Sequence, residues 1–440
     1  MPTREDFRLI PDANCLACGC LCDDVMLHVA AGRIAQAERA CPLGERWFLA
    51  ERPVDRPACL IDGRPANSEA GCERAAQLLA AAKSPLVFGL GGATCEAQRV
   101  AVAIADRLGA CIETGNDSSA ALAAAVQSVG MVTATLGEVR HRADLVIFWG
   151  VDPATTHLRH YERYSLTCTG RFVPRGRADR TCVVVDSRRT ITAESADVLL
   201  QIEPGGDHAA LKLLQTITDG ADDLDGDDVL RDTGVALDEW RELLNRMQTA
   251  RYGALFYDPS SCSIATLTSL LALVREMNRH TRFVALPLGS PGNMAGAEQV
   301  LSWQTGSPSA VNFAGGYPQY DPEKFSAAAM LASGKVDAAL IVACNSFIDP
   351  LAALPQAARD HLAAIPNIVL HDADVPPSTT AAVAFTVATP GIHSRGTMFR
   401  VDGVPLPLRP AIASPYPSTE TVLQSIQHSL QRAEGEVADR

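Results

Sequence analysis

The chain has 440 residues, and its 51 acidic against 38 basic side chains give a formal net charge of −13, which argues against nucleic acid or an anionic membrane as a partner. Residues 1–11 lack the apolar core of a signal peptide, and no apolar run elsewhere reaches the length of a membrane span. We therefore expect a cytoplasmic protein with no membrane segment, and its length allows two to four domains.

Cysteines gather near the start of the chain. The spacing C-x2-C-x3-C-x18-C is formed by Cys15, Cys18, Cys22 and Cys41, and Cys20 is left over and expected to point away. Three thiolates on a tight loop, with a fourth returned by a β-ribbon, can occupy the corners of a [4Fe–4S] cluster. Alternating apolar residues over 25–29, followed by a turn at 31–32, predict that ribbon. A zinc site or unmetallated buried thiols are the alternatives, although zinc usually takes two close cysteine pairs and only one is present.

From about residue 56 onward, short apolar runs alternate with amphipathic stretches. The apolar runs predict strands at 86–90, 145–150, 183–186, 254–257, 283–286, 339–343 and 368–371. The amphipathic stretches predict helices at 96–108, 208–218, 237–247, 264–277, 325–331 and 422–431. Continuously apolar strands that alternate with helices are typical of parallel, doubly wound α/β sheets with helices on both faces.

Changes in composition and periodicity along the chain indicate four parts. We expect a cysteine-rich β module at 1–55, an α/β domain at 56–219, a second α/β domain at 220–389, and a C-terminal β segment with a helix at 390–440. The division at 219 depends on the acidic stretch 219–232, which we interpret as a solvated surface connection before a new helix.

Three predicted strand ends carry sequences that suit a ligand, because open α/β sheets bind ligands beyond the carboxyl ends of their strands. The turn 89–94 is rich in glycine, and its amides suit a phosphate, although a plain tight turn is the better interpretation. The second end is 149–164. The third, 185–207, begins with Asp186, which is equally suited to bind a ribose or guanine amine and to pair with Arg188.

In combination, these features resemble the molybdenum and tungsten bis-pyranopterin guanine dinucleotide oxidoreductases. The tighter resemblance is to the B subunit of formylmethanofuran dehydrogenase, and it is carried by the segments 149–164, 172–177, 301–306, 312–318 and 396–405. The resemblance implies a multidomain molybdopterin-oxidoreductase-like α/β fold. It also implies pterin-binding positions at Gly91, Asp152, His157, Arg159, Asp186, Arg188 and Thr190.

The chain departs from this family where the metal would be bound. The family has a cysteine or selenocysteine followed by histidine in the loop before a helix, which is predicted here at 122–127. The matching loop, 113–121, contains neither residue, and Ser118 and Ser119 stand near the expected positions. A serine alkoxide or the Asp117 carboxylate can ligate molybdenum in other pterin enzymes, but Asn-Asp-Ser-Ser before an alanine-rich run is typical of a helix N-cap. Gly315 also stands where a basic residue is expected.

The family has a counterpart without redox chemistry, namely the B subunit of the bacterial formyltransferase/hydrolase complex. In that complex a formyl group passes from a tetrahydromethanopterin carrier to a methanofuran-like carrier and is released as formate. This resemblance implies a redox-silent structural subunit of one-carbon metabolism. Its partners would be a zinc amidohydrolase-like subunit, a formyltransferase and a further structural subunit.

The same resemblance implies that the tungsten or molybdenum bis-pyranopterin guanine dinucleotide is absent, that the pterin positions are vestigial and that a [4Fe–4S] cluster can still form. The alternative is an active tungsten or molybdenum formylmethanofuran dehydrogenase subunit, with Ser118, Ser119 or Asp117 as the metal ligand.

Overall fold

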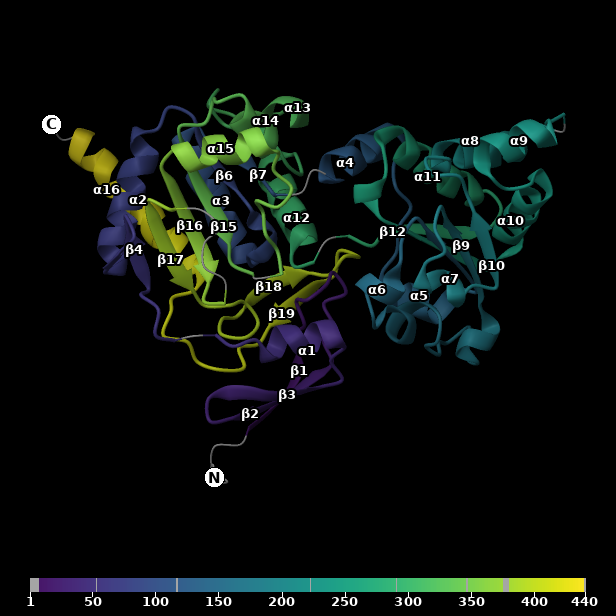
Figure 1. Cartoon of the computed structure of the whole chain (residues 1–440), viewed down its shortest axis with the longest axis horizontal. Coiled ribbons are helices and arrows are strands. Elements are labelled where there is room, and N and C mark those ends of the chain that lie inside the picture. The colour runs from purple at the N-terminus through teal and green to yellow at the C-terminus, as the bar shows by residue number, and fades with distance from the viewer. Residues whose placement is uncertain are drawn as a thin grey trace. The chain divides into compact units, whose positions relative to one another are not determined.

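A computed structural model describes residues 8–52, 54–115, 118–221, 223–289, 291–345, 347–374 and 380–438. They form two compact units, of which unit 1 comprises Met1–Asp117 with Ser290–Arg440, and unit 2 comprises Ser118–Gly289 (Figure 1). The expected boundary at 219 therefore falls inside unit 2, and the one at 389 falls inside unit 1. The reason is that unit 1 is assembled from two separated segments, which a pass along the chain does not reveal.

The N-terminal module is an antiparallel sheet. Its described strands follow the order β1-β2-β3, with bounds Arg8–Ala13, Val25–Ala30 and Arg33–Glu38. The apolar residues of β2 are buried and those between them are not, which confirms the predicted ribbon. Ala31 and Gly32 both take positive φ angles, 50° and 74°, as a tight hairpin turn requires. Helix α1 (Pro42–Leu49) follows directly.

Unit 1 also contains the larger sheet. Among the described residues it has nine strands in the order β14-β13-β7-β6-β15-β16-β17-β4-β5. The five central strands are parallel, and the pairs outside them are antiparallel. Their bounds are β4 Cys59–Ile61, β5 Arg64–Ala66, β6 Pro85–Phe88, β7 Cys111–Glu113, β13 Val311–Asn312, β14 Gln319–Tyr320, β15 Ala338–Ala343, β16 Asn367–Asp372 and β17 Val383–Val387. The strand order reverses between β6 and β15, which makes their carboxyl ends the switch point of this sheet.

Helices cover both faces of this sheet. Val87 of β6 belongs to the core beneath α2, α3, α12 and α16, whereas its neighbours Leu86 and Phe88 face the core beneath α14 and α15. The bounds are α2 Ser68–Ala81, α3 Cys95–Leu108, α12 Met294–Thr305, α13 Pro322–Phe325, α14 Ala327–Ala332, α15 Gln356–Ala364 and α16 Thr419–Ala438. A β-hairpin of β18 (Gly396–Phe399) and β19 (Pro405–Leu408) completes the C-terminal part.

Unit 2 contains a fully parallel sheet. Its five described strands follow the order β10-β9-β8-β11-β12, so the switch point lies between β8 and β11. The strand bounds are β8 Leu145–Trp149, β9 Thr181–Asp186, β10 Val198–Gln201, β11 Tyr252–Tyr257 and β12 Arg282–Pro287. The helices are α4 Ser118–Val129, α5 Leu136–Arg142, α6 Pro153–Thr156, α7 Ile191–Glu194, α8 Asp207–Thr218, α9 Gly226–Thr233, α10 Leu237–Thr249 and α11 Ile264–Met277.

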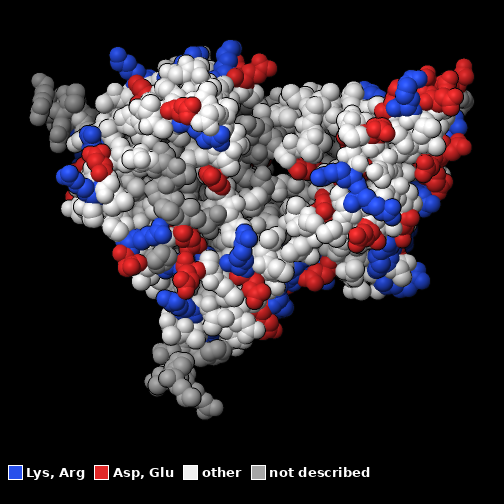
Figure 2. Space-filling view, in the orientation of Figure 1, with Lys and Arg blue, Asp and Glu red and all other residues white. Residues whose placement is uncertain are grey.

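The acidic stretch 219–232 is not simply a connection, because helix α9 begins within it. The Asp225 carboxylate caps this helix by accepting from the backbone N–H groups of Asp227 and Asp228. Acidic side chains gather over α9 on the surface (Figure 2). Carboxylates in a first helical turn are stabilised by the helix dipole, so local acidity was compatible with a helix. No helix in the described part of the chain is long and apolar enough to cross a membrane.

Candidate functional site

The four predicted ligand cysteines converge between the N-terminal ribbon and α1. The loop 15–22 closes on itself, because the backbone N–H of Cys15 donates to the carbonyl of Cys22 at 2.9 Å. Cys41 stands immediately before α1 as its N-cap residue. A Cβ atom on Gly44 would lie 2.8 Å from Sγ of Cys15 and 3.9 Å from Sγ of Cys41. Both thiols therefore lie over the first turn of α1, where glycine leaves room for them.

Electrostatics show that the four thiols share one small volume. The pKa of Cys15 is raised well above its usual value, first by burial and then by the neighbouring charges of Cys22, Cys18 and Cys41. Mutual repulsion of buried thiolates is offset when they bind a metal. Four neighbouring thiols with this chemistry suit a [4Fe–4S] cluster. No three of their Sγ atoms lie within 4.8 Å of one another, as the thiolates of a single tetrahedral zinc ion would.

The expectation that Cys20 points away is wrong. Hydrogen bonds from the Cys20 side chain, and from its backbone, lower the pKa of Cys18. The backbone of this loop turns sharply, with Leu21 at a φ of 41°, which brings Cys20 back against Cys18. Sequence spacing alone does not reveal such a turn at a residue other than glycine.

The cysteine loop rests on the C-terminal part of unit 1. The backbone N–H of Val401 donates to the carbonyl of Gly19 at 3.0 Å. Arg400 and Asp402 flank Val401 and form a two-pronged ion pair, with both N–O distances 2.7 Å. Their side chains are only 11% and 0% exposed. A buried ion pair near the end of the chain therefore supports the loop near its beginning.

In unit 2, the polar residues at the carboxyl ends of β8 and β9 are tied to α7. Asp152, after β8, accepts hydrogen bonds from the backbone N–H of Thr192 at 3.0 Å and from its hydroxyl, while its second oxygen accepts from Thr155 at 3.1 Å. Thr190 caps the same helix by accepting from the N–H of Ala193. Asp152 thus connects two strand ends.

Asp186 closes β9 and is buried. Its carboxylate accepts from the backbone N–H of Arg188 at 2.8 Å, and burial raises its pKa. The Arg188 guanidinium lies 3.9 Å away with its side chain 81% exposed, so it is free to move. Arg159 forms an ion pair at 2.5 Å with Glu162, which lies in the π-helical segment Tyr161–Ser165. The structure brings the predicted residues of unit 2 to one edge of its sheet.

Two buried histidines lie at the same strand ends. Nδ1 of His157 is 2.9 Å from the hydroxyl of Thr156, and burial lowers its pKa to about 4. His160, which sequence reasoning did not select, packs edge-on against Phe256 with Nδ1 2.9 Å from the hydroxyl of Ser165. Its pKa is lowered to about 3, again by burial. Both imidazoles are therefore neutral near pH 7.

Gly91 belongs to unit 1 and has a packing role. It lies in the short 3-10 turn Leu90–Gly92, where a Cβ atom would approach Sδ of Met294 to 2.0 Å. Its carbonyl accepts from the N–H of Asn293 at 2.7 Å. The close approach of α12 explains the glycine, in agreement with the interpretation of 89–94 as a tight turn.

The remaining candidates stand at the start of α4. The helix begins at Ser118, four residues before the predicted start at 122, and the residue that would cap it lies outside the described residues. Asp117 and the side chains of Ser118 and Ser119 lie outside the described residues, so their role as ligands stays a prediction.

Sequence reasoning missed a polar cluster at the carboxyl edge of the unit 1 sheet. Asn345 follows β15 and is 2% exposed, and its Nδ2 has no partner among the described residues. The same holds for the hydroxyl of Thr389, while His371 and Asp372 end β16 as buried residues. Buried polar atoms without partners mark places where a polar ligand or water binds. The strand-end rule, applied to 339–343 and 368–371, would have found this cluster.

The chain is similar in sequence to the B subunits of two kinds of enzyme complex. No family model matches the chain. It is 34% identical over 420 residues to the B subunit of the tungsten-containing formylmethanofuran dehydrogenase 2 of Methanocaldococcus jannaschii, covering 93% of this chain and 95% of the relative. It is 29% identical over 287 residues to the B subunit of the formyltransferase/hydrolase complex Fhc of Methylorubrum extorquens, covering 65% and 74%.

Solved structures give a matching picture. A chain of the formyltransferase/hydrolase complex FhcABCD from Methylorubrum extorquens, in complex with methylofuran, superimposes with a TM-score of 0.67 and 26% identity. The match covers 86% of this chain and 99% of that one. Acetylene hydratase from Pelobacter acetylenicus gives a TM-score of 0.60 at 12% identity over 97% of this chain and 70% of that one, which shows the fold alone.

Proposed function

The chain belongs to the family of formylmethanofuran dehydrogenase B subunits, and we propose that it is the redox-silent structural subunit of a formyltransferase/hydrolase complex. One observation carries this proposal. The loop 113–121, where the family places its metal-ligating cysteine and adjacent histidine, contains neither residue type. A soft thiolate suits tungsten or molybdenum, and an imidazole beside it moves protons. This loop therefore lacks the usual groups for binding the metal and for transferring protons.

The strand ends of unit 2 support the proposal. Asp152 and Asp186 accept hydrogen bonds from the chain itself, and the Arg159 guanidinium is paired with a carboxylate. Each side chain thus has a role in holding the fold that needs no bound dinucleotide. On this proposal, the bis-pyranopterin guanine dinucleotide and its metal are absent, and the pterin positions are vestigial.

The cysteine module is proposed to hold a [4Fe–4S] cluster through Cys15, Cys18, Cys22 and Cys41. When bound, the cluster would link the loop to the N-terminus of α1. The module is a three-stranded sheet with a small apolar core, and small modules of this kind commonly depend on a metal for stability. Its role here would be structural.

The partners proposed are a zinc amidohydrolase-like subunit, a formyltransferase and a further structural subunit. In such an assembly the formyl group moves from a tetrahydromethanopterin carrier to a methanofuran-like carrier and leaves as formate. None of the thirteen cysteines, all of which lie among the described residues, forms a disulfide, which suits the reducing cytoplasm where we place the complex.

A second candidate is an active tungsten or molybdenum dehydrogenase subunit. It is favoured by the unpartnered polar atoms of Asn345 and Thr389, which suit a polar ligand at the carboxyl edge of unit 1. In that case Asp117, Ser118 or Ser119 would supply an oxygen ligand in place of the thiolate.

Metal analysis of the purified complex separates the two candidates. We expect iron at about four atoms per chain, the content of one such cluster, without tungsten or molybdenum, together with formyl transfer and formate release. One tungsten or molybdenum per chain, with viologen-linked oxidation of the formylated carrier, would overturn the structural role. A Cys15→Ser variant is the control that assigns the iron to the cysteine loop, since it should lose the iron and keep the other subunits' activities.

A further inference from the structure

We propose that unit 2 carries a second, unrelated binding site, a cationic pocket for a small organic polyanion at the amino ends of β11 and β12. The pocket has a volume of about 530 Å³, and four arginines line it: Arg142, Arg251, Arg279 and Arg282. Tyr252 and Arg282 are the first residues of the two strands. It therefore lies at the opposite edge of the sheet from the strand ends near Asp152 and Asp186.

The pocket is lined by basic side chains, although the whole chain has a formal net charge of −13. Three of its arginines form an ion pair with a carboxylate: Glu138 lies 3.4 Å from Arg142, Asp144 lies 3.0 Å from Arg251, and Glu276 lies 2.7 Å from Arg279. Arg282 is exposed and forms no ion pair with any described residue.

These ion pairs leave the guanidinium groups available. The side chains of Arg251 and Arg279 are 68% and 76% exposed, whereas those of Asp144 and Glu276 are 17% and 23% exposed, so each guanidinium still presents N–H groups to solvent. A ligand carboxylate or phosphate can therefore share or replace the internal partner. Planar guanidinium groups bind both kinds of anion through two parallel hydrogen bonds, which favours a ligand with two or more anionic groups.

An exposed aromatic ring adds a fifth arginine, Arg171, and holds it near Arg142. Phe172 is 46% exposed, and the guanidinium carbons of Arg142 and Arg171 lie 4.9 and 5.6 Å from its ring centre. The backbone N–H of Phe172 donates to the carbonyl of His141 at 3.0 Å, which fixes the ring at the pocket wall. The ring thus holds two guanidinium groups near one another despite their repulsion.

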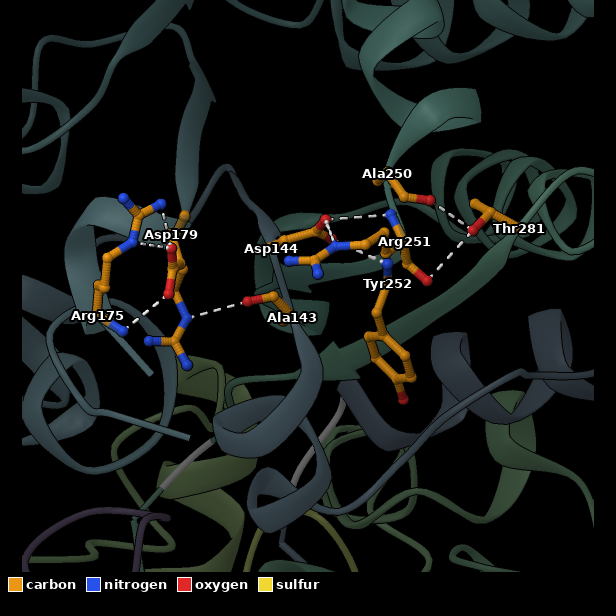
Figure 3. Close-up of polar contacts among 9 residues, drawn as sticks. Ala143, Asp144, Arg175, Asp179, Ala250, Arg251, Tyr252 and Thr281 are labelled. Carbon is orange, nitrogen blue, oxygen red and sulfur yellow. Dashed lines mark hydrogen bonds and ion pairs between the residues drawn. The ribbon is translucent and has the colours of Figure 1, made fainter. Parts of the chain in front are cut away.

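The backbone beside the pocket is preorganised by polar contacts of Asp144 and Thr281, which Figure 3 shows. One oxygen of Asp144 accepts from the backbone N–H of Tyr252 at 2.9 Å, and the other accepts from the backbone and side chain of Arg251. The Thr281 hydroxyl donates hydrogen bonds to the carbonyls of Ala250 and Arg251. A site whose backbone is already ordered loses little entropy when a ligand binds. The volume falls within the range of small-molecule sites, which favours a small ligand over a protein segment.

Calorimetric titration of the purified complex at low ionic strength tests this proposal. The probes are citrate as a polycarboxylate, pyrophosphate as a polyphosphate and acetate as a monovalent control. We expect one molecule of citrate or pyrophosphate to bind per chain and acetate to bind far more weakly. Saturation by citrate alone would assign a carboxylate ligand, and saturation by pyrophosphate alone would assign a phosphate ligand.

Two matched variants locate the site. Arg282→Gln removes an exposed charge inside the pocket and should weaken binding about tenfold, the loss of one charge-assisted pair. Arg241→Gln removes another exposed charge, from α10 outside the pocket, and should change the dissociation constant by less than about twofold. Equal effects of the two substitutions, or no saturable binding of either polyanion, would overturn the proposal.

Discussion

Replacing Asp402 by alanine removes one partner of the ion pair beneath the cysteine loop. Both N–O distances in this pair are 2.7 Å, and the Asp402 side chain is fully buried. The substitution removes the Asp402 carboxylate from the buried Arg400 guanidinium, which costs about 3–5 kcal/mol of folding free energy. For a unit of this size, that is a fall of about 6–10 °C in unfolding temperature.

A matched substitution shows why burial decides the magnitude. Glu73 pairs with Arg432 at 3.1 Å in the same unit, but the two side chains are 49% and 50% exposed. Glu73→Ala should therefore cost about 1 kcal/mol or less. The double variant Arg400→Met with Asp402→Leu should lose less stability than Asp402→Ala alone, because no uncompensated charge remains.

The assay is thermal unfolding of the purified complex, followed by circular dichroism, with iron content measured in parallel. Because Val401 donates to Gly19 of the cysteine loop, Asp402→Ala should also lower the iron content. An unfolding temperature within about 2 °C of the parent, or a double variant less stable than the single one, would refute this reasoning.

Three further predictions concern single positions. Gly44→Ala places a Cβ atom 2.8 Å from a ligand thiol and should lower iron content in the purified complex, and full retention of iron would contradict the convergence of the thiols. Gly91→Ala should destabilise unit 1 by about 1–3 kcal/mol through overpacking against Met294. Unfolding temperatures should show partial rescue by Met294→Ala, and no rescue would exclude that contact as the cause. The pKa of His160 is about 3 in the folded chain and about 6.5 when unfolded, so its stabilising effect is complete above pH 6.5 and is lost as the pH falls. His160→Gln should therefore reduce the drop in unfolding temperature between pH 7 and 5, and an unchanged drop would assign it to other groups.

Much of the fold follows from local pattern. The apolar runs at 145–150, 183–186 and 339–343 were predicted as strands and correspond to β8, β9 and β15. Continuous burial of such strands requires apolar residues on both faces, so the signal is strong and local. The short strands β13 and β14 were missed, because two-residue strands leave no periodic pattern.

Of the candidate sites, the cysteine loop could be predicted from the sequence and the arginine pocket could not. The C-x2-C-x3-C spacing identified the cysteine loop, because three ligands on one short loop leave a signature in the sequence. The arginine pocket left none, since Arg142, Arg251 and Arg282 come from three separate segments. Cys20 was misplaced because its orientation depends on a positive φ angle at Leu21.

By itself, the sequence determined the parallel α/β class, the clustering of cysteines at 15–22 and 41, and the lack of cysteine and histidine in the loop 113–121. These are properties of residue type and short-range spacing. Only the tertiary structure decided that residues 1–117 and 290–440 form one unit, and that Met294 covers Gly91. It alone placed the buried Arg400–Asp402 pair beside the cysteine loop, because the burial of this local pair and the contact of Val401 with Gly19 depend on segments hundreds of residues apart.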